Sequence, residues 1–89
     1  MDKPGRVEIL GWGLVRNIMV TSVIDAVVDD LKNQVLAREL PPNSPLTEAE
    51  VAARYDVARA TAKAAIERLV ADKVLVRKNH KTARVVKLG

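Results

Sequence analysis

The cationic residues Arg59 and Lys63 stand four positions apart in the segment R-A-T-A-K. In a helix, this spacing places both side chains on one face, where they can donate hydrogen bonds to phosphates or to base edges. The acids Asp25 and Asp29 show the same spacing, but no base, nucleophile or metal ligand accompanies them. We interpret these acids as solvent-exposed residues of a helix and the cationic pair as a candidate binding element.

The composition excludes several kinds of active site. The chain has 89 residues, no cysteine and a single histidine, His80, so disulfides, cysteine-ligated zinc and thiol chemistry are excluded. No phosphate-cradling glycine loop and no catalytic triad is recognisable. Two aromatic residues, Trp12 and Tyr55, are too few to stack the bases of a single-stranded nucleic acid. The sequence therefore predicts no enzymatic activity, no catalytic residue, no metal and no cofactor.

Positive charge is concentrated at the C-terminal end. The whole chain has a net charge of +4, whereas residues 1–30 carry −2. The last 17 residues contain no acid and six basic residues: Lys73, Arg77, Lys78, Lys81, Arg84 and Lys87. This end would meet a polyanionic partner first, and the alternative is a solvated basic tail.

Length and hydropathy indicate one small domain away from membranes. At 89 residues the chain has room for one core, which aliphatic residues must fill. Glu8 and Arg16 interrupt the apolar N-terminal stretch, so a secretory signal is not expected. No apolar run approaches the roughly 20 residues of a membrane-spanning helix. We expect a cytoplasmic protein that does not bind a membrane.

A first helix is predicted over residues 22–38. Thr21 and Ser22 are candidate caps, and the double proline at Pro41 forbids continuation, which leaves residues 40–45 as an extended connector. Aliphatic residues recur there with the spacing of one helix face: Ile24, Val27, Val28, Leu31 and Val35.

Residues 1–21 show no clear period and contain three glycines. We interpret them as an N-terminal extension that buries Trp12 either on its own core or in a dimer contact.

Two further helices and a hairpin follow. Thr47 and Glu50 can form a capping box at the start of a short helix, and Asp56 suits a turn that Val57 fixes to the core. The next helix, about residues 58–72, repeats small and aliphatic residues on one face: Ala62, Ala65, Ile66 and Leu69. The β-forming segments V-L-V-R-K and A-R-V-V-K-L then predict a two-stranded hairpin.

These elements together predict a mainly α chain with a small β-hairpin, an α+β winged helix-turn-helix of three helices and a two-stranded wing. The second helix of a helix-turn-helix is the element that enters the major groove of DNA. Arg59 and Lys63 lie near the start of that helix.

A family resemblance is carried by the segment A-R-E-L-P-P-N-S-P-L-T-E-A-E-V-A-A-R-Y-D-V-A-R-A-T-A-K-A-A-I-E-R-L. It resembles the DNA-binding domain of GntR-family transcriptional regulators, whose pattern runs roughly G-x-L-x-P-G-x-x-L-s-E-x-x-L-A-x-x-x-G-V-S-R-x-P-V-R-x-A-L. The resemblance covers about residues 22–86. Matching residues are Leu40, Pro42, Leu46, Thr47, Glu48, Val51, Ala52, Val57, Arg59, Ala65, Ile66 and Leu69.

Departures from the family pattern concern turns and binding residues. Family glycines are replaced by Arg38, Asn43, Asp56 and Lys73, and the wing glycine is missing near Lys81 and Thr82. The usual serine, proline and second arginine are replaced by Ala58, Thr61 and Lys63. Loss of the serine removes a helix cap, and lysine lacks the bidentate geometry of arginine toward guanine. These changes bear on affinity and base specificity more than on fold.

The pattern and the resemblance give a set of candidate DNA-binding residues: Thr47, Arg59, Thr61, Lys63, Asn79, His80, Lys81 and Arg84. Arg59 is expected to read a base edge, and Lys63 to contact a base or a phosphate. The threonine hydroxyls are candidates for phosphate contacts, although Thr47 is also a helix cap. The resemblance implies that a wing over about residues 77–84 approaches the backbone or the minor groove. Arg54 and Arg68 are weaker candidates beside the groove, and Arg68 has an alternative partner in Asp72.

We divide the chain into an extension, residues 1–21, and a winged helix-turn-helix domain, residues 22–89. The resemblance implies a transcriptional regulator that binds double-stranded DNA as a homodimer. It also implies that a small-molecule effector is expected only if a further C-terminal domain exists. The competing hypothesis is a protein-interaction module that has repurposed its recognition face.

Overall fold

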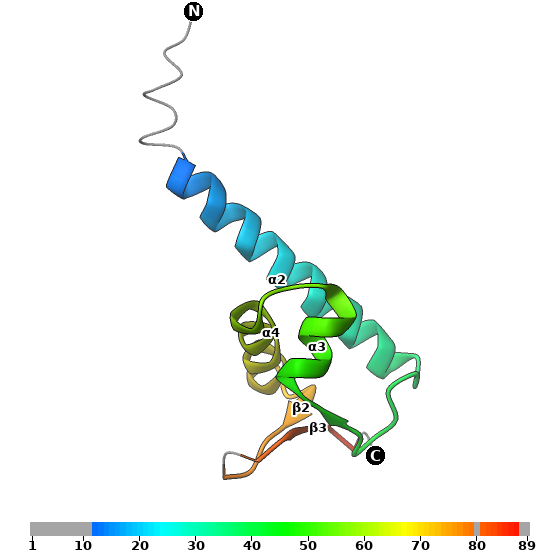
Figure 1. The fold of residues 1–89 in the computed structure, drawn as a ribbon. Coiled ribbons are helices and arrows are strands. Elements are labelled where there is room, and N and C mark those ends of the chain that lie inside the picture. Colours follow the sequence, from blue (N-terminus) through cyan, green and yellow to red (C-terminus); the bar gives the residue numbers. More distant parts are fainter. Residues whose placement is uncertain (1–11, 80, 88–89) are drawn as a thin grey trace, which may run out of the picture.

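The structure, a computed structural model, describes residues 12–79 and 81–87 and contains three helices and three short strands in this part of the chain (Figure 1). Figure 1 shows the C-terminal half of the long helix α2 packed behind α3 and α4, with the strands below them. The elements are α2 (Trp12–Leu36), β1 (Pro45–Leu46), α3 (Glu48–Tyr55), α4 (Arg59–Ala71), β2 (Leu75–Val76) and β3 (Ala83–Val85).

The three helices and the sheet enclose one aliphatic core, and the helix residues in it have the predicted spacing. Its buried residues are Val27, Val28, Leu31, Val35, Leu46, Val51, Ala62, Ala65, Ile66, Leu69, Leu75, Ala83 and Val85. The expected inward residues Ile24, Ala52, Tyr55 and Val57 pack against it while partly buried. Alanines on α4 leave little side-chain volume between the helices, so α4 can lie close to both neighbours. The core therefore fixes which face of α4 points outward.

Helix α2 begins at Trp12, well before the predicted start near Ser22. A single glycine inside a helix, such as Gly13, costs only about 1 kcal/mol relative to alanine, which the rest of a long helix can tolerate. The candidate caps Thr21 and Ser22 thus lie inside the helix. The expected burial of the Trp12 side chain lies outside the described residues.

The first half of α2 lacked a helical period because it extends beyond the core. Figure 1 shows this half projecting away from the other elements. From residue 18 on, where the structure describes the side chains, the apolar residues Ile18, Met19, Val20 and Val23 are exposed. No described helix meets the length and hydropathy needed to cross a lipid bilayer.

The helix-turn-helix has the predicted start and turn. The Thr47 hydroxyl accepts from the Glu50 backbone N–H at 3.1 Å, so the Thr47 cap is confirmed. The Glu50 carboxylate accepts from the Thr47 hydroxyl at 3.1 Å rather than from its backbone N–H, so the reciprocal half of the capping box is not formed. Asp56 ends α3 in the left-handed region with a φ of 53°. Val57 donates its backbone N–H to the Ala52 carbonyl at 3.0 Å, which closes the turn before α4.

The sheet has three strands rather than the predicted two. Its order is β1-β3-β2, and both neighbours of β3 are antiparallel to it. The connector before α3 adds β1, with Leu46 buried opposite Ala83 and the exposed Pro45 opposite Arg84. Proline is tolerated in β1 because an edge strand does not need every backbone N–H. The predicted hairpin of β2 and β3 is confirmed.

Two surface ion pairs join α2 to the C-terminal part of α4 and its cap residue Asp72. Arg68 pairs with Asp25, and Lys32 pairs with Asp72 at 2.9 Å. The expected pairing of Arg68 with Asp72 was therefore wrong, because Asp25 on the neighbouring helix holds the guanidinium. The hydrogen bond to Asp25 raises the pKa of Arg68. Arg68 is thereby engaged between the helices.

Candidate nucleic-acid interface

A groove of about 380 Å³ lies between the start of α3, the outer face of α4 and the loop of residues 77–82 that joins β2 to β3. We call this loop, with the two strands, the wing. The groove is lined by Leu46, Thr47, Glu48, Ala49, Arg59, Lys63, Arg77, Lys81, Thr82 and Ala83. Four of these residues are basic and one is acidic, so the groove has an excess of hydrogen-bond donors for an anionic ligand.

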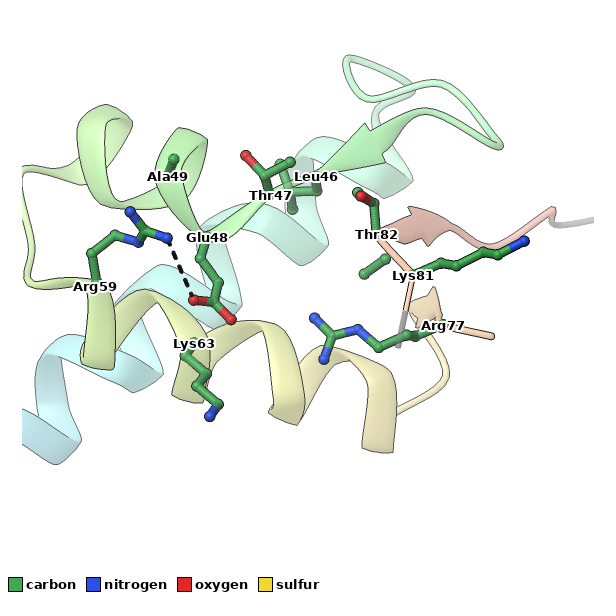
Figure 2. A pocket seen from close by; sticks show the side chains of 10 residues that line it. Leu46, Thr47, Glu48, Ala49, Arg59, Lys63, Arg77, Lys81 and Thr82 are labelled. Carbon is green, nitrogen blue, oxygen red and sulfur yellow. Dashed lines mark ion pairs between the residues drawn. The ribbon is translucent and has the colours of Figure 1, made fainter. Parts of the chain in front are cut away.

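The cationic residues of α4 lie on its exposed face because the core holds the opposite face. Arg59 is the first residue of α4, and Lys63 follows one turn later on the exposed side. Ala58 occupies the N-cap position and makes no side-chain cap. Glu48 is the first residue of α3, and its Oε1 atom lies 4.0 Å from Arg59 Nη2 (Figure 2).

The wing supplies the other side of the groove. Figure 2 shows Arg77 reaching back toward α4, whereas Lys81 points away from that helix. The Lys81 backbone N–H donates to the Lys78 carbonyl at 3.0 Å, and Asn79 adopts a φ of 50°, which closes the loop without glycine. The short turn therefore leaves Arg77 beside α4 and Lys81 on the outer side of the wing.

The groove brings together half of the predicted binding residues: Thr47, Arg59, Lys63 and Lys81. Thr61 is half-buried on α4 and does not line the groove, and Asn79 is exposed in the wing loop. Arg84 donates to the Asn43 carbonyl at 3.0 Å and lines a second hollow, which shares Lys81 and Thr82 with the groove. His80 lies outside the described residues.

Sequence reasoning missed three polar residues that line the groove, Glu48, Arg77 and Thr82. Arg77 belongs to the basic C-terminal run, and the charge gradient was a signal for it. Glu48 had no such signal, because its approach to Arg59 depends on the turn that places the starts of two helices side by side. The weak candidate Arg54 instead donates to Gln34 Oε1 on α2 at 2.8 Å.

Family comparison agrees with this arrangement. Residues 23–85 match the model of the family described as bacterial regulatory proteins, gntR family. The chain belongs to the gntR family. The match includes α3, α4, all three strands and the C-terminal part of α2, which packs on the core.

Solved structures of gntR-family proteins share the fold. One is a GntR-family transcriptional regulator from Pseudomonas syringae pv. tomato str. DC3000, with 27% identity, a TM-score of 0.68, and coverage of 74% of this chain and 28% of that chain. Another is GntR of Streptococcus agalactiae, with 26% identity, a TM-score of 0.61, and coverage of 72% and 32%. No curated protein matches the sequence. This chain thus spans about a third or less of the gntR structures it matches, and the winged helix-turn-helix is the shared part.

Proposed function

We propose that this chain is the DNA-binding domain of a transcriptional regulator. It binds double-stranded DNA with α4 in the major groove and the wing on the adjacent DNA backbone or minor groove. The carrying observation is the groove that Arg59 and Lys63 of α4 line together with Arg77 and Lys81 of the wing. A cytoplasmic location follows from this role. Membership of the gntR family and its shared fold support the proposal.

The dimensions of α4 suit this placement. Its 13 residues give a helix of roughly 20 Å, and the major groove is about 12 Å wide and admits one α-helix. Base-reading residues in such a helix come from its N-terminal part. Arg59 occupies that position, with its side chain 69% exposed.

Each candidate residue has a proposed contact. Arg59 donates to a guanine edge, and Lys63 donates to a base or a phosphate, because both extend from the outer face of α4. Thr47 and Thr61 are placed at flanking phosphates. The wing residues are placed at phosphates or in the minor groove: Arg77, Asn79, His80, Lys81 and Arg84.

Mobility-shift titration with duplexes selected by the wild-type chain from a random library tests this function. Arg59→Ala should weaken the selected duplex by about 1 to 3 kcal/mol and flatten the preference over random duplex, because a bidentate base contact is lost. Arg54→Ala is the matched control, since Arg54 contacts Gln34 of α2 instead of the groove. Wild-type protein that binds no duplex, or equal discrimination by Arg59→Ala and wild type, would contradict the proposal.

We further infer a homodimer on a pseudo-palindromic site with half-sites about one helical turn apart. The exposed apolar residues Ile18, Met19, Val20 and Val23 of α2 support self-association, because pairing would remove them from water. Sedimentation velocity over a concentration series should show a dimer that replacement of Met19 and Val23 by serine weakens. A monomer at every concentration, with and without duplex, would contradict this inference.

A further inference from the structure

Glu48 is the acidic residue among those that line the groove, and it lies beside the residue assigned to base reading. Its Oε1 atom is 4.0 Å from Arg59 Nη2. Each residue begins its helix, so the turn at Asp56 brings the two charges together from α3 and α4. Figure 2 shows the Glu48 carboxylate between Arg59 on one side and Arg77 on the other, with Lys63 below it on α4.

The pair does little for folding. The Glu48 and Arg59 side chains are 31% and 69% exposed, and an ion pair this accessible to water is screened and weak. An acid in the first turn does favour a helix start, but Glu50 provides a second one in the same turn of α3. The larger consequence of Glu48 is for a ligand, because a carboxylate inside a cationic groove repels phosphate.

Taking the proposed DNA binding as its basis, we propose that Glu48 is a specificity-determining residue. Its carboxylate lies beside the Arg59 guanidinium in the groove that would meet the base edges, and it disfavours occupation of the same space by a phosphate. Arg59 therefore contributes to reading sequence more than to binding any polyanion.

The carboxylate also has a preferred partner in DNA. In the major groove a carboxylate accepts from exocyclic amino groups, and cytosine N4 is the usual one. Glu48 thus selects a cytosine next to the guanine that Arg59 reads. The paired side chains together recognise two neighbouring base pairs instead of one.

The test compares Glu48→Gln with Glu50→Gln in the full chain. Both variants remove one negative charge from the first turn of α3, and glutamine at position 50 keeps the capping geometry. Glu50 does not line the groove. The measurements are the dissociation constant for a random-sequence duplex and the base frequencies in duplexes that each variant selects from a random library. Thermal unfolding establishes that the two variants fold alike.

Glu48→Gln should bind random duplex roughly threefold or more tightly than Glu50→Gln, because the repulsion of phosphate acts inside the groove. It should also lose the cytosine preference at one position, whereas Glu50→Gln keeps it. A gain no larger than that of Glu50→Gln, with all base preferences retained, would overturn the inference while wild-type selectivity still supported DNA binding. A wild-type chain without sequence preference would overturn the proposed function and this inference together.

Discussion

Tyr55 connects α3 to α2 through a polar network at the edge of the core. Its hydroxyl donates to Asp30 Oδ2 at 2.5 Å, and the Gln34 amide donates to the same carboxylate at 2.7 Å and to the Tyr55 oxygen at 3.1 Å. Burial raises the pKa of Tyr55 to about 12, and the hydrogen bond to Asp30 adds to this effect. Deprotonation would place a negative phenolate next to the negative Asp30 carboxylate, and the two would repel each other. The folded state is therefore stabilised by the neutral phenol.

We therefore expect an alkaline loss of stability that depends on Tyr55. The pKa in the folded state lies above the ordinary value of 10.0, so the contribution of the phenol is complete below pH 10 and is lost as pH rises toward about 12. Because Tyr55 is the only tyrosine, phenolate absorbance reports this site alone. The difference in unfolding free energy between wild type and Tyr55→Phe should shrink over this range. An absorbance midpoint near pH 10 in the folded protein would contradict the prediction.

Lys73 adopts a φ of 64°, a left-handed conformation that side chains with a β-carbon disfavour. The GntR pattern has glycine at this position, after the last turn of α4. Lys73→Gly should raise the free energy of unfolding by about 0.5 to 1 kcal/mol. Glycine relieves the backbone strain of the folded state, and its greater freedom in the unfolded chain offsets part of this gain. Urea denaturation measures the change.

Asn43→Gly is the matched control for Lys73→Gly. Asn43 has a φ of 67°, but asparagine tolerates the left-handed region because its short amide bonds locally. Its replacement should change stability by less than the lysine substitution does. Equal effects of the two substitutions would show that backbone strain is not the cause.

Among the elements, α4 begins without a side-chain cap. Ala58 holds the N-cap position with extended dihedral angles but offers no oxygen to the free backbone N–H groups, and the first turn has no acid. Ala58→Ser should stabilise the domain by about 1 kcal/mol, because a serine hydroxyl at this position accepts from the first turn. Thermal unfolding tests this, with Ala60→Ser as the control inside the helix. A lower melting temperature for Ala58→Ser than for wild type would contradict the prediction.

The elements differed in how well the sequence predicted them. The faces of α3 and α4 were predictable because apolar residues are selected at helical spacing wherever a core covers one side, as at Val51 and Ile66. The same signal fails at Ile18, where no core selects a face of α2. Strand β1 has two residues, too few to show a period of two, and its pairing with β3 depends on chain segments far apart in sequence.

The residues of the candidate site also differed in how well the sequence predicted their positions. Arg59 and Lys63 were found because both lie on one helix with a core-defined face. The position of Arg84 was not predicted, because its hydrogen bond to the Asn43 carbonyl depends on the pairing of β1 with β3. The Glu48 contact likewise arises from the angle between two helices, which side-chain type and spacing do not encode.

At the scale of the whole molecule, charge is separated along the chain and the fold gathers part of the positive end at the groove. The last 17 residues carry +6, and of these Arg77 and Lys81 join Arg59 and Lys63 around one hollow. Binding of DNA through such a surface releases counterions, so affinity should fall steeply with salt. The slope of log affinity against log salt counts the phosphates that the protein contacts.

Lys81→Ala should therefore reduce the magnitude of this salt slope by about one, because one phosphate contact is lost, and should weaken selected and random duplexes alike. Arg77→Ala should have the same effect, because the Arg77 side chain is also proposed to contact a DNA phosphate. Lys32→Ala is the charge-matched control, since Lys32 pairs with Asp72 away from the groove. The measurement is fluorescence anisotropy over a series of salt concentrations. Equal slopes for wild type and both wing variants would place the wing away from the DNA and leave α4 as the sole contact, because the slope responds only to phosphates that are neutralised.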